Sequence, residues 1–498
     1  MTTPPNVIIL LGLAAIAAGI GDEVARQTSR RLGWLAAGPF VLLAASPLVP
    51  NYSIALGFSL DDALPLLGLL MMLPLVPWGR LRATYWAPTP GTTIALAGIL
   101  TMIVAGLISA VLVGGELGDV VRLAIRGSGR WTFLLLIVVC VAVLGSTERS
   151  RLFSARVMAL VGTFEAAFGL VAYFIGFPRN AGLEATRQSS VLFGEVPGRI
   201  SGTLGISPNF TAAILMITIL VSAGLALRTS ERRERVAWWA AVVVQFAALT
   251  LTYTRVSLGL AIVALAILVL LRSRPILLLP IGAVLVPIAV FTPMLQRLVS
   301  DMPDRLALWT SAFLLMIDHP FFGVGAGQMA AAVAQEPERY RSTIFGQAWS
   351  TAHNTVLLAG AETGVLGAIG AILLNLGLAV IVIHVFLRAP RGPAGVLAVA
   401  SALALGAFLA QGMVNNLFTV GVTGLFAAFL LGSQLLEARL PLDADGGTGI
   451  RPRGWSDLVP RWWRPAQDPL VPGGQDGGGV RPVQPDLLDA GDTRRAEA

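Results

Sequence analysis

The sequence predicts an all-α, polytopic integral membrane protein. Of its 498 residues, 55% are hydrophobic and only 13% are charged, and the mean hydropathy is +0.76. Soluble globular proteins carry about 25% charged residues, so a water-soluble core could not bury this much apolar surface. The apolar residues also come in runs of about 20, the length that an α-helix needs to cross the hydrocarbon layer. A bilayer is therefore the expected solvent.

The apolar runs predict about 12–14 transmembrane helices. The N-terminal run follows no basic segment and has no clear cleavage site, so we interpret it as a first span and not as a signal peptide. The run at 355–387 is long enough to be tilted, or broken at Gly364 and Gly367. The predicted spans lie near residues 5–20, 33–49, 62–78, 92–113, 131–146, 154–177, 208–227, 236–254, 256–272, 275–292, 355–387, 393–412 and 415–436.

Clusters of arginine orient the predicted helices. The sequence contains no lysine, and one set of alternate loops is short and rich in arginine. Because cytoplasmic loops concentrate positive charge, this set is expected in the cytoplasm and the longer loops 178–206 and 293–353 on the outer face. The segment 115–130 is then an outer loop in which acidic residues partly offset the arginines. Its charged residues are Glu116, Asp119, Arg122, Arg126 and Arg130.

Composition also excludes some classes and divides the chain. The net charge of +7 does not predict nucleic-acid binding, because the arginines lie in short clusters between apolar runs. Cys140 is the single cysteine, so no disulfide or cysteine-based zinc site is expected within the chain, and a buried structural thiol is the favoured interpretation. Residues 1–437 form the predicted membrane domain. Residues 438–498, rich in Gly, Pro, Asp and Arg, are expected to be a disordered cytoplasmic tail.

The outer loop 293–353 is too polar to span the membrane. Its first part, over 300–320, predicts an amphipathic helix that lies against the outer leaflet, with Arg305, Trp309 and Phe313 on one stripe at a spacing of four. An arginine that merely snorkels is the alternative interpretation of this pattern.

A glycine-rich stretch, FFGVGAGQM, follows at residues 321–329. Its GxGxG spacing is not a dinucleotide fingerprint, because no strand precedes it. We expect a tight turn with exposed backbone amides. Such amides can hold phosphate oxygens, although a plain loop is the favoured interpretation.

Charged residues at a membrane boundary are costly, so each needs a reason. On the predicted outer face Arg255 lies between two spans with almost no loop, Arg199 precedes the span that Pro208 and Asn209 open, and Arg305 lies on the amphipathic helix. A solvated arginine without a function is the alternative in each case, most of all for Arg199.

His353 is one of only three histidines, and with Asn354 it lies at the predicted N-terminus of the span 355–387. The positive end of the helix dipole disfavours an imidazolium there, and a neutral ring can accept a proton from an alcohol near pH 7. A structural histidine is the alternative. Glu362 lies nine residues on, about half a turn out of phase on a straight helix, so we do not expect it to touch His353 unless the glycines break the helix.

Several arginines with one base fit a phosphate-bearing substrate. Arginine forms bidentate hydrogen bonds with phosphate oxygens, and it can neutralise the charge that grows on a pyrophosphate leaving group without a metal ion. We predict no metal site on the outer side, although Asp301 with Asp304 remains an alternative.

Four segments, in this order along residues 195–370, resemble the bacterial family of O-antigen ligases and polymerase-related membrane glycosyltransferases. The first 190 residues are similar to the family only as a bundle of spans. In the second segment Thr254 stands where the family commonly has serine. The segments are GRISGTLGISPNFTA, LTLTYTRVSLGL, DRLALWTSAFLLMIDHPFFGVGAGQ and HNTVLLAGAETGVLG.

The resemblance implies a multi-pass enzyme of the bacterial inner membrane. It implies transfer of a glycan, with inversion, from undecaprenyl pyrophosphate to a hydroxyl of a glycan, lipid or protein acceptor on the extracytoplasmic face, with no cofactor, nucleotide sugar or metal. The family includes ligases and polysaccharide polymerases, and the motifs do not separate them. A transporter or flippase of a lipid-linked glycan is the alternative from another class, but we see no internal repeat and the charges gather at one surface.

The resemblance also implies roles for individual residues. His353 would act as the base or orient the acceptor, and Arg255 and Arg305 would bind the pyrophosphate, with Arg199 in the same pocket. Three further residues are expected to support the site: Asn354, Glu362 and Trp309.

Overall fold

The protein is represented by a computed structural model. Most of the description rests on long segments, which are residues 89–144, 148–175, 198–203, 207–272, 302–344, 346–389 and 393–419. Short pieces are also described at 53–55, 58–59, 69–70, 183–184, 188–190, 194–196, 424, 426–428 and 430–432. All of them belong to one compact unit, Met1–Ile450. The predictions for the tail 438–498 and for the spans near 5–20, 33–49 and 275–292 lie outside the described residues.

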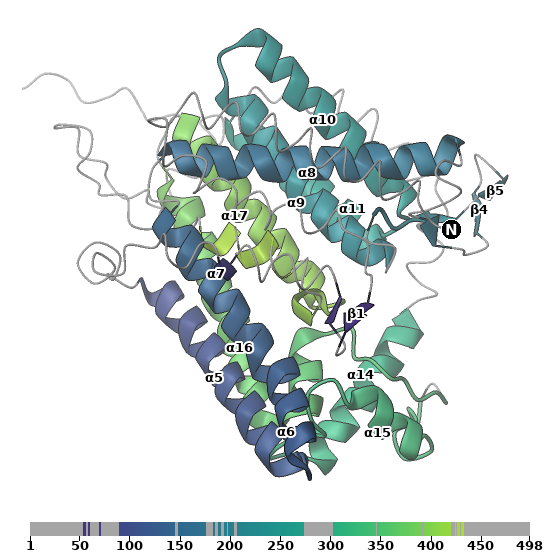
Figure 1. Cartoon of the computed structure of the whole chain (residues 1–498). Coiled ribbons are helices and arrows are strands. Elements are labelled where there is room, and N and C mark those ends of the chain that lie inside the picture. Colours follow the sequence, from purple (N-terminus) through teal and green to yellow (C-terminus); the bar gives the residue numbers. More distant parts are fainter. Residues whose placement is uncertain are drawn as a thin grey trace, which may run out of the picture. The chain divides into compact units, whose positions relative to one another are not determined.

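The described part of the chain is mainly α-helical (Figure 1). Its helices are α5 (Pro90–Val113), α6 (Leu117–Ala124), the π-helical turn η3 (Ile125–Gly129), α7 (Arg130–Leu144), α8 (Glu148–Ile175), α9 (Pro208–Arg228), α10 (Arg232–Leu251), α11 (Arg255–Arg272), α14 (Met302–Asp318), α15 (Met329–Gln335), α16 (Thr355–Arg388), α17 (Pro393–Gly412) and the 3-10 turn η5 (Leu417–Thr419).

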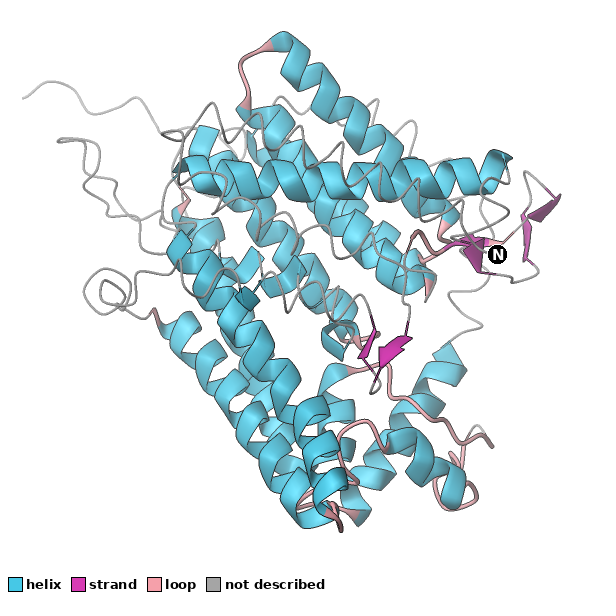
Figure 2. Ribbon diagram, in the orientation of Figure 1, coloured by secondary structure: helices cyan, strands magenta, loops and turns pink. Residues whose placement is uncertain are grey.

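The described strands are short and form antiparallel pairs at the ends of helices (Figure 2). The pairs are β1 (Ser53–Ala55) with β2 (Phe58–Ser59), β3 (Leu183–Glu184) with β6 (Arg199–Ile200), and β4 (Gln188–Ser190) with β5 (Gly194–Val196).

Seven of the described helical segments are long and apolar enough to cross a membrane, and α11 is a shorter apolar helix. They match the predicted spans between residues 90 and 412 to within a few residues at most ends. The all-α polytopic membrane fold is therefore confirmed, while the total of 12–14 spans stays a prediction.

One predicted loop is wrong. Residues 117–142 form a continuous membrane-length helical segment where we expected an outer loop at 115–130. Its glycines hid the helix from sequence reasoning, but they allow close packing with α5: a Cβ at Gly127 would lie 3.3 Å from the Gly106 Cα. Beside it, the Ser128 hydroxyl donates to the Ile103 carbonyl at 2.6 Å. The contact with α5 holds the π-helical turn in place.

Helices α5 and α16 pack antiparallel through glycines. A Cβ at Gly98 would lie 2.3 Å from the backbone nitrogen of Leu374, and one at Gly377 would lie 2.2 Å from that of Ala95. Small residues let membrane helices approach closely enough for extensive van der Waals contact. The pairing positions α16, which begins after His353 and its N-cap Asn354.

We expect Gly98→Ala to lower the free energy of unfolding by about 1–3 kcal/mol, the usual cost of overpacking a close contact. Gly118→Ala is the matched control, since no other group lies within 4 Å of its Cβ position, and alanine stabilises an exposed helix by about 0.5–1 kcal/mol relative to glycine. Thermal unfolding of the two variants in the same detergent makes the comparison. Equal melting temperatures would contradict the close approach.

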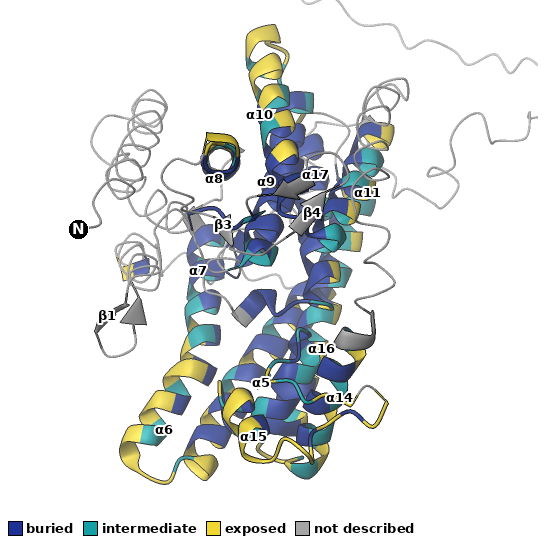
Figure 3. Cartoon of the chain, turned by 90° about the vertical axis from the view of Figure 1, so that its right-hand side faces the viewer, coloured by how far each residue is buried: buried dark blue, intermediate teal, exposed yellow. Residues whose placement is uncertain are grey.

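Helix α9 packs against four other helices, α8, α10, α11 and α17, and lies at the centre of this group (Figure 3). Most of its residues are buried, from Pro208 to Ala226. Polar contacts also join these helices, because the Gln245 amide donates to Thr163 Oγ1 at 2.8 Å and to Ser222 Oγ at 3.2 Å. The N-terminal end of α9 lies beside the start of α11 and the end of α17, because Asn209 accepts hydrogen bonds from the Thr254 hydroxyl at 3.2 Å and from the Gln411 amide at 3.3 Å.

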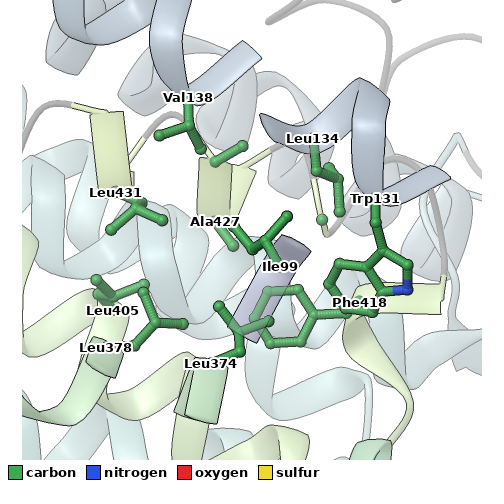
Figure 4. A pocket seen from close by; sticks show the side chains of 12 residues that line it. Ile99, Trp131, Leu134, Val138, Leu374, Leu378, Leu405, Phe418, Ala427 and Leu431 are labelled. Atoms are coloured by element: carbon green, nitrogen blue, oxygen red, sulfur yellow. The ribbon is translucent and has the colours of Figure 1, made fainter. Parts of the chain in front are cut away.

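A small apolar cavity of about 20 Å³ lies between α5, α7, α16 and α17 (Figure 4). Trp131 and Phe418 line it, with ring centroids 5.8 Å apart. A cavity of this size could hold one water molecule, but water also needs polar partners, and the lining is almost entirely apolar. We therefore interpret it as a dry packing defect.

Candidate active site

Several predicted site residues meet on one short segment, residues 411–416 (QGMVNN), which runs from the last residues of α17 to the start of η5. The Arg305 guanidinium of α14 donates to the Val414 carbonyl, and the Asn354 amide donates to the Met413 carbonyl at 2.9 Å. A guanidinium and the start of α16 are thus held against consecutive peptide groups of this segment.

His353 contacts the same segment. Its side chain is near the positive charge of Arg305 and forms a hydrogen bond with the Asn415 side chain. Burial and the Arg305 charge lower the pKa of His353 below its ordinary value, while the hydrogen bond to Asn415 acts in the opposite direction. The imidazole is therefore neutral at pH 7, the form that can accept a proton.

Asn354 is the N-cap of α16. Its Oδ1 accepts hydrogen bonds from the backbone N–H groups of Val356 and Leu357 at 2.9 and 3.0 Å. His353 thus lies directly before the first turn, where the helix dipole also disfavours a positive charge on the ring.

Arg199 is the centre of a second group of polar residues. Its Nε donates to the Thr252 carbonyl at 2.9 Å, and its terminal nitrogen donates to Asn209 Oδ1 and Thr254 Oγ1, both at 3.2 Å. These partners come from the start of α9 and the junction of α10 and α11, so Arg199 joins two helix ends.

The two groups meet through Gln411, whose amide donates to the Asn209 backbone carbonyl at 3.3 Å. Consecutive Cα atoms are about 3.8 Å apart, so the Cα atoms of Gln411 and Val414 are separated by at most about 11 Å. The anchor points of Arg199 and Arg305 therefore lie close together, at the same end of the helices.

Arg255 is the first residue of α11 and follows Thr254 directly. The preceding residue, Tyr253, has φ of +52°, and among the described non-glycine residues only Tyr253 and His353 have a positive φ. Such backbone strain is found where the surroundings enforce it, and it concentrates at functional sites. Here one strained residue is His353 itself, and the other lies two residues before Arg255. The structure places the Arg255 backbone beside the Arg199 group.

A buried carboxylate holds the loop that carries Arg199. Glu165 of α8 is 1% exposed and accepts hydrogen bonds from the backbone N–H of Thr203, at 3.0 Å, and from the Thr203 hydroxyl. Gly202 has φ of +63°, and a Cβ there would lie 2.3 Å from the Glu165 carboxylate. Sequence reasoning missed Glu165, although a lone Glu inside the predicted span 154–177 was the available signal.

The amphipathic helix predicted over 300–320 is α14. Arg305 is partly buried and reaches the Val414 carbonyl, so it does not snorkel toward solvent. Trp309, one turn on, is partly buried, and its Nε1 is buried without a hydrogen-bond partner in the described structure. Phe313, by contrast, is 48% exposed. The three residues of the predicted stripe therefore differ in exposure: Arg305 and Trp309 are partly buried, whereas Phe313 is exposed.

Several backbone amides of the glycine-rich loop 321–329 are taken by α16. Its Gly325 N–H donates to the Glu362 carbonyl at 2.9 Å, its Val324 N–H donates to the Ala361 carbonyl at 3.0 Å, and its Gly327 N–H donates to the Glu362 carboxylate. The favoured interpretation as a plain loop therefore holds for these amides. They are not exposed for a phosphate, because acceptor groups of α16 already bind them.

Glu362 contacts this loop, and no contact with His353 is found among the described residues. Helix α16 is interrupted where we predicted, with non-helical backbone angles at Thr363 and Gly364. Arg126 and Arg130, the two arginines that fitted poorly on an outer face, lie near the Glu362 carboxylate and interact with its charge. Glu362 therefore joins α16, η3 and the loop, and its role in supporting the site stays a prediction.

Sequence reasoning did not identify the segment 411–416. It places three amide side chains just after a long apolar run, and this density of polar residues at the end of a span was the available signal. Besides the contacts above, the Asn416 amide donates to Thr351 Oγ1 at 2.9 Å.

A family model described as O-antigen ligase matches residues 240–372. This match confirms the resemblance over a range that contains Arg255, Arg305, His353 and Glu362. Arg199 lies outside it. No curated protein matches the chain. One similar solved structure is described as "Structural coordination of polymerization and crosslinking by a peptidoglycan synthase complex", with 18% identity over 69% of this chain and 97% of that chain and a TM-score of 0.38.

Proposed function

We propose that this membrane protein transfers a glycan from an undecaprenyl-pyrophosphate carrier to an acceptor hydroxyl on the outer face of the bacterial cytoplasmic membrane. The observation that carries the proposal is the meeting of Arg305 and His353 on the segment 411–416, with the Arg199 group joined to the same segment. The O-antigen ligase match over residues 240–372 supports it.

The proposed reaction is an inverting displacement at the anomeric carbon. The acceptor oxygen attacks that carbon while His353 takes the hydroxyl proton. The bond between the anomeric carbon and the phosphate oxygen breaks, and its electron pair leaves with the pyrophosphate. Arg305, with Arg255 and Arg199, binds the diphosphate and neutralises the charge that grows on it. Because arginine supplies this charge, no metal ion is needed.

The distribution of arginine supports an extracytoplasmic site. The ends of α9 and α16 farthest from the site carry Arg228 and Arg388, and α10 begins with Arg232 and Arg233. Positive charge concentrates on the cytoplasmic side of membrane proteins. The site lies at the other helix ends, together with the long loop that includes α14 and α15.

A polysaccharide polymerase of the same family would use the same chemistry. The two activities differ in the acceptor, which is another glycan repeat for a polymerase and a lipid or protein for a ligase. The segment 411–416 and His353 would serve either acceptor, so the acceptor must be found by experiment.

A transporter or flippase of a lipid-linked glycan is less well supported. Such proteins bind their substrate near the middle of the membrane, at broken helices. Here the central helix α9 buries an apolar middle, from Ile214 to Leu220, that includes the single hydroxyl of Thr218. The charged groups gather instead at the helix ends.

The test is transfer in vitro by the purified full chain. The protein is mixed with an undecaprenyl-pyrophosphate glycan and, in separate reactions, with a lipid, a protein and a glycan acceptor, and released undecaprenyl pyrophosphate is measured with the product. Product with any acceptor supports the enzyme and identifies its kind. Movement of the labelled lipid across a proteoliposome membrane, without product from any acceptor, would contradict it in favour of a flippase.

The rate of transfer should depend on pH through His353. Because burial and Arg305 lower its pKa, the rate should stay constant from neutral pH to below pH 6.5, the ordinary pKa of histidine, and fall only in more acidic solution as the ring is protonated. Arg305→Gln removes a positive charge, so its residual activity should fall at a higher pH than that of the wild type. Identical pH profiles of the two proteins would show that another group controls the acidic limb.

A further inference from the structure

One face of α8 carries three residues that each contact a segment of the candidate site. Glu165, Gly169 and Tyr173 follow one another at a spacing of four, and residues at this spacing are neighbours on the same side of an α-helix. We call them the α8 stripe. Glu165 and Tyr173 are 1% and 7% exposed, so their polar groups lie inside the protein. The proposed reaction assigns no role to any of the three.

The first two residues of the α8 stripe contact the loop that begins with Arg199. The Glu165 carboxylate accepts two hydrogen bonds from Thr203 of this loop. A Cβ at Gly169 would lie 2.5 Å from Ile200 Cγ2, so only glycine at this position lets the buried Ile200 pack directly on the helix. The loop is therefore held against α8 at two points, and one of them is the residue next to Arg199.

The third residue of the α8 stripe contacts the junction of α10 and α11. The Tyr173 and Tyr253 hydroxyls form a hydrogen bond, with 3.1 Å between the two oxygens. Tyr253 has the positive φ of +52° and lies two residues before Arg255, the first residue of α11. A strained backbone persists only where its surroundings enforce it, and the hydrogen bond from α8 is part of that support.

The two segments also contact each other, since Arg199 Nε donates to the Thr252 carbonyl at 2.9 Å. We infer that Glu165 and Tyr173 are positioning residues for the proposed transfer. Through the α8 stripe, α8 sets the places of the segments that carry Arg199 and Arg255, and so controls how tightly the pyrophosphate of the donor is bound. The inference rests on the proposed function of these two arginines. Arginine holds phosphate through a planar fork of donors, so its hydrogen bonds depend on where the guanidinium lies.

The experiment measures binding of undecaprenyl pyrophosphate to the purified full chain, in nanodiscs of neutral lipid, by native mass spectrometry. Tyr173→Phe removes one hydroxyl and should weaken binding by about threefold, the net effect of one hydrogen bond. Glu165→Leu removes both acceptors of Thr203 and should weaken it by about tenfold or more. Glu165→Gln keeps one carbonyl acceptor, so its loss should be smaller than that of Glu165→Leu.

The partner of Tyr173 gives an internal check. Tyr253→Phe should weaken binding as much as Tyr173→Phe does. The double variant should be no weaker than either, because all three lack the same hydrogen bond. Additive losses in the double variant would overturn the role of this contact.

Thr163→Val is the matched control, because it also removes a hydroxyl from α8. Thr163 Oγ1 accepts a hydrogen bond from the Gln245 amide at 2.8 Å, so its loss should lower the melting temperature and leave binding of the carrier unchanged. If the α8 stripe only stabilised the fold, Tyr173→Phe and Glu165→Gln would behave in the same way as Thr163→Val. Binding as tight in those two variants as in the control would therefore overturn the inference.

Transfer from an undecaprenyl-pyrophosphate glycan separates this inference from the proposed function. In Tyr173→Phe and Glu165→Gln the KM for the donor should rise, while the KM for the acceptor and the pH profile, which depends on His353, should not change. A rise in both KM values would overturn the positioning of the arginines. If the wild type binds the carrier but yields no product with any acceptor, the proposed transfer fails, and the binding results still decide the role of α8.

Discussion

Replacing His353 is expected to lower the rate of glycan transfer by about 10²–10⁴-fold, the range that a positioned general base contributes. Alanine at this position also has to adopt the φ of +45°, so a loss in His353→Ala mixes chemistry with backbone strain. Asparagine tolerates this left-handed conformation. His353→Asn is therefore the sharper variant, because it removes the base and keeps the backbone.

His319 offers the control for this prediction. It lies at the end of α14 and is exposed, so His319→Asn should transfer at nearly the rate of the wild type. The measurement is the initial rate of product formation, with melting temperatures to show that each variant is folded. If His353→Asn works as fast as His319→Asn, the base must be sought elsewhere, with Asn415 and Asn416 left as orienting groups only.

Replacing Arg305 with glutamine is expected to lower kcat by about 10²–10³-fold, the usual cost of losing one group that stabilises the charge of a transition state. Arg305→Lys should lose part of this, because lysine keeps the charge but not the planar fork that holds phosphate by two hydrogen bonds. The order wild type, lysine, glutamine is the result that identifies phosphate binding.

A structural role alone for Arg305 would give a different order. Its hydrogen bond to the Val414 carbonyl positions the segment 411–416, and either substitution could disturb that segment. The kinetic split separates the two roles: loss of positioning alone should change the melting temperature and leave the lysine and glutamine variants equally slow. Arg341→Gln is the control, since Arg341 is exposed and paired with Glu338 at 2.6 Å, and its rate should match that of the wild type.

Helix α14, which carries Arg305, is held against the loop that leads to His353 by hydrogen bonds at two points. Its Ser311 hydroxyl donates to the Tyr340 carbonyl at 2.8 Å and accepts from the Trp349 N–H at 3.1 Å. At its end, Arg339 donates to Asp318 at 2.8 Å, and this hydrogen bond lowers the pKa of the Asp318 carboxyl. The outer loop thus contacts α14 near Ser311 and near Asp318. We expect these contacts to limit movement of Arg305 relative to His353.

Local patterns were enough for the spans and for part of the site. Runs of apolar residues predicted α5, α8, α9, α16 and α17, because a span depends on its own length and composition. The same is true of the position of His353 and Asn354 at the start of α16, which depends only on where the apolar run begins. The break at Gly364 was also predictable, because glycine permits the positive φ that the chain has there.

Contacts between distant parts of the chain were not predictable in this way. The helical residues 117–130 were missed because their glycines and arginines resemble a loop until α5 and Glu362 are placed beside them. Glu165 gave no pattern of its own, since its partner Thr203 lies 38 residues away.

The apolar runs were enough to show that the protein spans a membrane many times, and the residues between them indicated which helix ends carry the candidate residues and that His353 stands before a helix. The folded chain was needed to show that the segment 411–416 gathers Arg305, His353 and the Arg199 group, and that Glu362 contacts the glycine-rich loop. Apolar periodicity is a local property, whereas hydrogen bonds between polar groups can join residues about 200 positions apart, such as Asn209 and Gln411.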